Sequence, residues 1–231
     1  MAEAPESTAA HIATRGTRRR TETRRRLLAA ARTVFAREGL DAATIAQITT
    51  EADAGFGTFY LHFTTKEEAY RAVITEGFGE LVMALERVRE ETAGSGATWP
   101  AMIRAAIRAY CEFAVSNREL FTVMFAGGGV GIHLGRELQE RFAASIAVQL
   151  AQAGEAPSRE AQDLPWPYPP MPVAIATVAA ITRAMLWWLG QEESLEEPEA
   201  SEASDLPPSL ETLIETMSRY VTAALWGQLP G

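Results

Sequence analysis

The stretch that most restricts the fold is residues 44–66, which reads TIAQITTEADAGFGTFYLHFTTK. Thr44 and Gln47, three residues apart, fit a capping box, so a helix is predicted to start at Thr44. The segment from Asp53 to Gly57 should end this helix, because Asp tolerates left-handed backbone and Gly has no Cβ to clash. A sharp reversal of the chain is therefore predicted here.

A second, much shorter helix is predicted over Thr58–Phe63, with two turns at most. Phe59 and Phe63 are four residues apart and can pack inward together, so Tyr60 and His62 must point elsewhere. Two short helices that meet across a tight turn form a helix-turn-helix. In that arrangement the second helix, the recognition helix, enters the major groove of DNA.

Over about residues 21–70 the chain resembles the TetR family of bacterial transcription regulators. The core Gly-Thr-Phe-Tyr-x-His-Phe, followed by a capped Lys, is highly specific. The matching residues are Thr44, Ile45, Ile48, Ala52, Gly57, Thr58, Phe59, Tyr60, His62, Phe63, Lys66 and Glu67. The resemblance implies an all-α protein with an N-terminal three-helix head and a larger C-terminal helical domain for ligand binding and dimerisation.

The resemblance also implies which side chains touch DNA. Phosphate contacts are expected from Thr44, Tyr60, His62 and Lys66, although packing within the head is an alternative for Tyr60 and His62. Thr44 and Lys66 lie at helix N-termini, where N–H groups and the helix dipole favour anions. The start of the recognition helix should face base edges, where a Phe or Thr methyl can touch a thymine methyl. The residues at this start are Gly55, Phe56, Gly57 and Thr58.

Four positions differ from the usual family pattern. Asp53 replaces the turn glycine, and Gly55 replaces a frequent Ser. Phe56 stands where Lys is common, and Leu61 stands where Arg is common. These changes remove two possible cationic contacts and leave the expected fold unchanged.

Charge is divided unevenly along the chain, whose formal net charge is −9. Residues 1–66 hold ten Lys or Arg and seven Asp or Glu. A basic head on an acidic body suggests that one end meets a polyanion. Residues 1–20 are predicted to be a disordered basic arm, and the arginine run continues through Arg24 and Arg25. Such a run is either a solvated surface or a contact to DNA phosphates or the minor groove.

Apolar residues at helical spacing predict further helices. The first ends at Gly39 and covers the helix-turn-helix, which completes a DNA-binding domain over residues 21–66. A long helix over residues 66–92, capped by Thr65, links it to the C-terminal domain, residues 67–231. Further helices are predicted over residues 99–116, 118–126, 130–153, 173–190 and 209–226. Proline-rich residues 154–172 and acidic residues 191–208 are predicted to be flexible loops.

The last two helices, residues 173–190 and 209–226, each carry an apolar stripe. They are either internal core or an interface between two copies. TetR-like proteins use their last two long helices for a four-helix dimer interface, so the resemblance implies a homodimer.

The body is rich in aromatic and thioether side chains, most of which should be ordinary core. If some line a cavity, its ligand should be mainly hydrophobic, because no cluster of like charges marks a partner for a strong ion. The candidates are Met102, Tyr110, Phe113, Phe121, Met124, Phe125, Phe142, Trp166, Met185 and Trp187.

Enzymatic chemistry is not indicated by any motif. Cys111 is predicted to be a core residue, and the single cysteine suits a reducing cytoplasm. Three scattered histidines form no metal-ligand pattern, and no cofactor is predicted. No uninterrupted apolar run reaches the ~18 residues that a membrane span needs.

These features together favour a cytoplasmic, homodimeric, DNA-binding transcription regulator. A repressor released from DNA by a small, mainly hydrophobic effector is the preferred form. The alternative is an architectural DNA-binding protein that dimerises and senses nothing.

Overall fold

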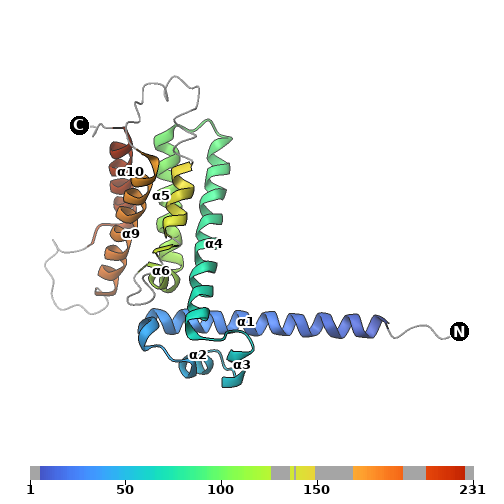
Figure 1. The fold of residues 1–231 in the computed structure, drawn as a ribbon. Helices are drawn as coiled ribbons and strands as arrows, with labels where there is room; N and C mark the ends of the chain where they lie inside the picture. The colour runs from blue at the N-terminus through green and yellow to red at the C-terminus, as the bar shows by residue number, and fades with distance from the viewer. Residues whose placement is uncertain (1–5, 126–135, 138, 149–168, 195–206, 227–231) are drawn as a thin grey trace.

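The structure is a computed structural model that describes residues 6–125, 136–137, 139–148, 169–194 and 207–226. Its labelled elements are all helices, as the sequence predicts. A small head lies at the foot of Figure 1 and a body of upright helices stands above it. The helices are α1 (Glu6–Ala42), α2 (Ile45–Glu51), α3 (Phe56–Tyr60), α4 (Lys66–Ala93), α5 (Trp99–Ser116), α6 (Arg118–Phe125), α9 (Pro170–Ser194) and α10 (Leu210–Trp226).

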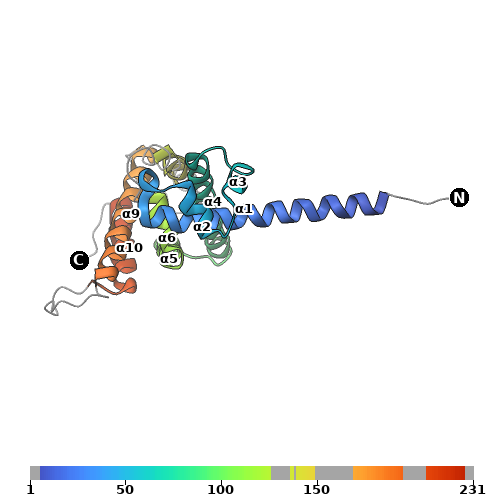
Figure 2. The ribbon, with the colours of Figure 1, turned by 90° about the horizontal axis from the view of Figure 1, so that it is seen from below.

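Helix α1 is longer than predicted. It starts at Glu6 and projects far beyond the rest of the molecule in both views (Figures 1 and 2). The prediction of a disordered arm over residues 1–20 is therefore wrong for residues 6–20. The physical reason is cooperativity, since extending a helix that packing has already nucleated costs far less than starting one. The helical path breaks near the predicted end, at Gly39, where φ is 73°.

The core of the head joins three helices. Leu27 and Val34 of α1 are almost fully buried, and so are Ile48 of α2 and Phe59 of α3. Burying one such side chain stabilises a fold by about 1.5–3 kcal/mol. Phe63, just after α3, is also buried, and its ring lies 5.5 Å from that of Phe59 between centroids. The predicted inward pair of phenylalanines is confirmed.

Helix α4 runs from the head into the body, as predicted for residues 66–92. Its N-cap is Thr65, whose hydroxyl accepts a hydrogen bond from the backbone N–H of Glu68 at 3.1 Å. The reciprocal half of the capping box is displaced by one residue. The Glu68 carboxylate accepts bonds from the N–H and hydroxyl of Thr64, each 2.6 Å long, and these bonds lower the Glu68 pKa.

Helix α6 packs against both α1 and α4. The Thr33 hydroxyl of α1 donates to the Glu119 carboxylate of α6 over 3.1 Å. The Tyr70 hydroxyl of α4 donates to the Val123 carbonyl of α6 over 2.8 Å, in a buried position. Head and body are therefore held together at α6 as well as through the continuous α4.

The approach of α4 to α6 is close because residue 77 is a glycine. A Cβ added to Gly77 would lie 2.6 Å from Met124 Sδ and 2.8 Å from Leu120 Cδ1. Two carbon-sized groups need about 3.5–4.0 Å, so a larger residue here would force side chains apart. Small size at this position sets the distance between the two helices.

Two predicted loop boundaries need correction. Helix α9 starts at Pro170 rather than at residue 173, because proline is tolerated in the first turn of a helix, whose N–H groups lack intrahelical partners. The helix also continues to Ser194, past the predicted end at residue 190. The rest of the two predicted loops lies mainly outside the described residues. Within the predicted helix over residues 130–153, residues 139–148 are helical.

Helices α5, α9 and α10 pack together on the side of the body away from the outer end of α1 (Figures 1 and 2). Arg108 of α5 reaches the Glu211 carboxylate of α10 through contacts of 2.6 and 2.7 Å. Between α5 and α9, the Tyr110 and Thr182 hydroxyls lie 2.7 Å apart in the core. Burial raises the pKa of Tyr110, so this phenol stays neutral at physiological pH.

One helix segment in the described part of the chain, Pro170–Gly190, is long and apolar enough to cross a membrane by composition. It packs against α5 and α6, and 39% of the window is buried inside the molecule. A core-facing helix of a globular protein has these same properties.

Candidate nucleic-acid interface

The turn between α2 and α3 has the predicted cap and chain reversal, but it is shorter than predicted, because α3 runs from Phe56 to Tyr60 rather than from Thr58 to Phe63. The Thr44 hydroxyl accepts from the Gln47 N–H at 3.2 Å, and the Gln47 side chain accepts from the Thr44 N–H at 2.8 Å. Asp53 adopts φ 47°, the left-handed conformation expected of it. The Ala54 N–H then donates to the Thr49 carbonyl over 2.9 Å, which closes the turn.

Helix α3 divides cleanly into an inner and an outer face. Phe59 is fully buried, whereas Phe56 is 55% exposed and Tyr60 49% exposed. The exposed rings of Phe56 and Tyr60 meet edge to face, with their centroids 5.5 Å apart. Gly55 and Gly57 are exposed on either side of Phe56. The start of α3 therefore presents an aromatic surface to solvent.

Two arginines of α1 hold this unit in place through its backbone. Arg26 donates to the carbonyls of Ala52 and Asp53, where α2 ends. Arg20 donates to the carbonyl of Leu61, which follows α3, over 3.4 Å. A cation at a helix C-terminus also complements the helix dipole. The arginine-rich sequence around these two residues gives no sign of such backbone contacts.

The two arginines singled out for DNA contact, Arg24 and Arg25, both have acidic partners. Arg24 lies 3.1 Å from the Glu76 carboxylate, and its guanidinium stands over the Phe63 ring at 5.0 Å. Arg25 pairs with Glu22 on the same helix at 2.6 Å, and this bond raises the Arg25 pKa. These pairs are exposed, so a phosphate can compete for each guanidinium at small cost.

Lys66 has a role within the fold. Its ammonium group donates to the carbonyls of Asp41 and Ala43, over 2.9 and 3.0 Å. It thereby ties the start of α4 to the end of α1. An ammonium has three N–H donors, so these two bonds leave one donor for a phosphate.

His62 is partly buried next to α3. Its pKa is lowered, first by burial and then by the positive charges of Arg20 and Arg24. The imidazole is therefore mostly neutral at pH 7 in the free protein. A phosphate placed beside it would favour the protonated form and partly reverse this shift.

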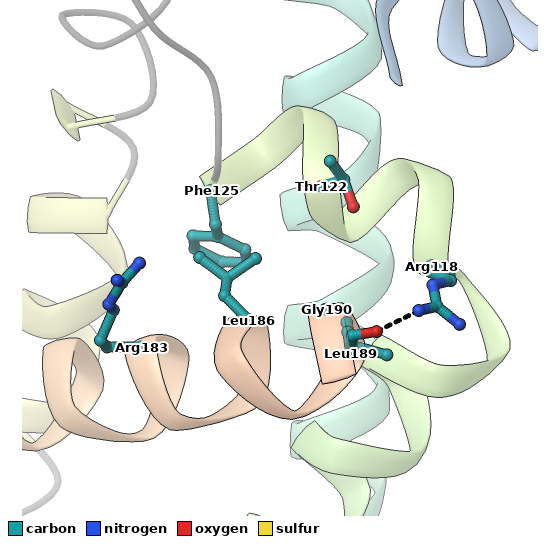
Figure 3. A pocket seen from close by; sticks show the side chains of 7 residues that line it. All are labelled: Arg118, Thr122, Phe125, Arg183, Leu186, Leu189 and Gly190. Carbon is teal, nitrogen blue, oxygen red and sulfur yellow. Dashed lines mark hydrogen bonds between the residues drawn. The ribbon is translucent and has the colours of Figure 1, made fainter. Parts of the chain in front are cut away.

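A second candidate site is a cavity of about 380 Å³ between α6 and α9 (Figure 3). The Phe125 ring and the Leu186 side chain lie face to face in it, with Arg183 and Arg118 toward opposite ends. Arg118 donates to the Leu189 carbonyl. The lining residues are Arg118, Thr122, Phe125, Arg183, Leu186, Leu189 and Gly190.

Of the predicted pocket residues, Phe125 lies in this lining. Met102 is half-buried on α5, Trp187 is 47% exposed on α9, and Trp166 lies outside the described residues. The remaining candidates are buried in the core, namely Tyr110, Phe113, Phe121, Met124, Phe142 and Met185. The residues that line the cavity follow helical spacing along α6 and along α9. Nothing in the sequence indicates that these two helix faces pack against each other.

Cys111 is buried, as predicted for a core residue, and burial raises the pKa of its thiol to about 11. It is therefore a poor nucleophile at neutral pH. Among the residues the structure describes, His, Cys, Asp and Glu side chains form no group of three that could hold a metal ion.

A short helix pair joined by a tight turn, with a side-chain cap at the start of its first helix and a helical body above it, defines a helix-turn-helix protein. Residues 27–73 match the sequence profile of the family "Bacterial regulatory proteins, tetR family". The resemblance to the TetR family is thereby confirmed for the head. No curated protein sequence matches the chain significantly.

Solved structures extend the likeness to the whole fold. A TetR-like transcriptional regulator from Rhodococcus sp. RHA1 shares 17% identity and a TM-score of 0.64, with 89% of this chain and 97% of that one covered. The fatty acid degradation regulator FadR from Bacillus halodurans shares 15% identity and a TM-score of 0.66, with 88% and 96% covered. FadR from Bacillus subtilis, solved in complex with stearoyl-CoA, shares 16% identity and a TM-score of 0.61, with 88% and 98% covered. The described part of the chain has the TetR-like fold.

Replacing Lys66 with Ala should lower the free energy of unfolding by about 1–2 kcal/mol, because two charge-assisted bonds to carbonyls at and just after the end of α1 are lost. Replacing Arg71, an exposed cation of the same helix, with Ala should change it by less than about 0.5 kcal/mol. Urea denaturation of both variants measures the difference. Equal stabilities would show that the Lys66 bonds contribute little to the fold.

Proposed function

We propose that this protein is a sequence-specific, DNA-binding transcription regulator that acts as a homodimer. The observation that carries the proposal is the recognition helix α3, held by buried Phe59 and Phe63 so that Phe56 and Tyr60 face outward. Its geometry is that of a helix-turn-helix, whose second helix lies in the major groove. Tyr60, His62, Thr44 and Lys66 are the proposed phosphate contacts around it.

The projecting half of α1 has a place in this proposal. Arg18, Arg19 and Arg20 are exposed on it. Arg20 also bonds to the carbonyl of Leu61, which directly follows α3, so this part of α1 lies beside the recognition unit, residues 44–63. A basic helix next to a groove-binding helix gains affinity by releasing counterions from phosphates. Salt-dependent binding is the expected consequence.

Tyr60 offers a test of the docking mode. Replacing it with Phe removes only the hydroxyl, and we expect DNA affinity to fall about tenfold, as for a lost hydrogen bond to a charged group. Ser95→Ala removes an exposed hydroxyl from the loop after α4, outside the head and the proposed dimer interface, and should bind DNA as the wild type does. Affinities should be measured on DNA flanking the protein's own coding region after a footprint locates the site. Equal affinity of all three proteins would refute this phosphate contact.

The proposed dimer interface is formed by α9 and α10. Ile175 and Trp187 are exposed on α9 at 44% and 47%, and Tyr220 is exposed on α10 at 52%. Large aromatic and apolar side chains on one side of a body are typical of an interface. Since this side lies opposite the projecting end of α1, pairing here leaves both heads free to reach one DNA molecule (Figure 2).

Introducing charge into this surface should separate the subunits. Trp187→Glu is expected to sediment as a monomer at micromolar concentration, because an unpaired carboxylate in an apolar interface is strongly unfavourable. Met83→Glu, at a 62% exposed position of α4, should remain dimeric. Sedimentation equilibrium measures both masses, and a dimeric Trp187→Glu protein would place the interface elsewhere.

We further propose that a small, mainly apolar ligand with one anionic group acts on α6. Phe125, Leu186 and Leu189 supply apolar contacts in the cavity, and Arg183 supplies a cation at one end (Figure 3). The same α6 carries Glu119 and Val123, which bond to α1 and α4. A ligand that displaces α6 therefore acts on the helices that hold the head.

Release from DNA then follows from two states of the dimer. Two heads must be spaced about one helical turn of DNA, roughly 34 Å, to reach successive grooves. A ligand that favours a different spacing lowers DNA affinity, by no more than its own preference between the two states. The cavity beside α6 favours a regulator that senses a ligand over the alternative of an architectural protein that senses nothing.

Decanoate is a suitable first probe, since the cavity volume is at the small end of ligand sites. It should raise the melting temperature of the wild type and not that of Leu186→Trp, whose indole fills the cavity. Decanol, which lacks the carboxylate, should give a smaller shift that Arg183→Gln leaves unchanged. Identical shifts in the wild type and Leu186→Trp would place any decanoate binding outside this cavity.

A further inference from the structure

The outer face of the recognition unit is unusually poor in polar groups. Residues 55–61 read Gly-Phe-Gly-Thr-Phe-Tyr-Leu, and their only side-chain polar atoms are the hydroxyls of Thr58 and Tyr60. Phe56 and Leu61 are 55% and 68% exposed. The surface offered to a groove is therefore aromatic and aliphatic.

Nearby cations are held at the edges of this surface. The guanidinium groups of Arg20 and Arg26 bond to backbone carbonyls at the ends of α3 and α2. Arg24 pairs with Glu76 and covers the inner ring of Phe63. These guanidinium groups can meet phosphates at the edges of the surface, but none extends from the start of α3, where the base edges would lie.

Phe56 is the foremost side chain at the start of the helix. Gly55 and Gly57 flank it, and a Cβ built on Gly57 would meet nothing within 4 Å. The edge of the Tyr60 ring supports the Phe56 ring from one side. A groove can therefore approach this backbone closely while the Phe56 ring makes the first contact with the bases.

Base chemistry then limits what α3 can recognise. Guanine is read mainly by Arg or Lys, and adenine by Asn or Gln, through paired hydrogen bonds. Helix α3 carries none of these four residue types. The feature of the major groove that an apolar side chain can recognise is the 5-methyl group of thymine.

We propose that Phe56 is a specificity-determining residue that reads thymine methyl groups, so that the binding site carries thymine wherever this ring meets the groove. This inference rests on the proposed DNA-binding function and names the base feature that function uses. A 5-methylcytosine presents the same methyl group and should partly replace thymine.

The test begins by selecting bound duplexes from a random pool with the wild-type protein. Each thymine of the enriched site is then replaced singly by deoxyuridine, which removes only the methyl group. At one or two positions in each half-site we expect affinity to fall about three- to tenfold, as for one buried methyl. Cytosine at those positions should bind weakly, and its 5-methylation should restore part of the affinity.

Variants assign the effect to a side chain. Phe56→Ala should bind the thymine and uracil duplexes equally at the sensitive positions, and its folding is checked by circular dichroism. Met83→Ala removes a similarly exposed apolar side chain from α4, outside the surface offered to the groove, and should keep the discrimination. Persistence of the thymine preference in Phe56→Ala would overturn the assignment to this ring.

The outcomes separate the two proposals. An enriched site with no uracil-sensitive position would refute methyl readout and leave the DNA-binding regulator intact. Loss of binding on replacing guanine with 7-deazaguanine at the positions facing α3 would show hydrogen-bonded readout instead, and would also refute the inference. A pool with no enriched site would refute the proposed function itself.

Discussion

The structure depends on one constraint, which is that α2 and α3 are too short to be stable alone. Helices of seven and five residues form few internal hydrogen bonds, and isolated helices below about 12 residues are marginal in water. Their stability comes from α1 and α4, which supply the buried wall of the head. The recognition unit is therefore only as rigid as the two helices that extend past it, and both reach the body.

Local chemistry made most of the fold predictable. Capping at Thr44 and Thr65, the positive φ at Asp53 and the end near Gly39 are set by residues a few positions apart. The N-terminal extension of α1 was not predicted, because residues 1–14 are small and polar and show no apolar helical period. Proline at residue 170 was taken to exclude a helix that it can in fact begin. In both cases the composition of a segment was given more weight than its helical hydrogen bonding.

The site was predictable only where its parts are close in sequence. The exposed face of α3 follows from spacing, since burial of Phe59 and Phe63 turns Phe56 and Tyr60 outward. The contact of Lys66 with the end of α1 joins residues more than twenty positions apart, so no local sequence pattern predicts it. The cavity is harder still to predict, because it lies between α6 and α9 and the sequence of neither helix indicates that the two pack together.

The glycine on α4 that touches α6 has an evolutionary consequence. Gly77 lets α4 approach the Met124 and Leu120 side chains so closely that a Cβ at position 77 would require both side chains to move. A bulkier residue at position 77 is therefore best accommodated together with smaller ones at positions 120 and 124. These three sites should thus drift through related sequences as a single compensating unit, under a restriction that no requirement of base recognition imposes.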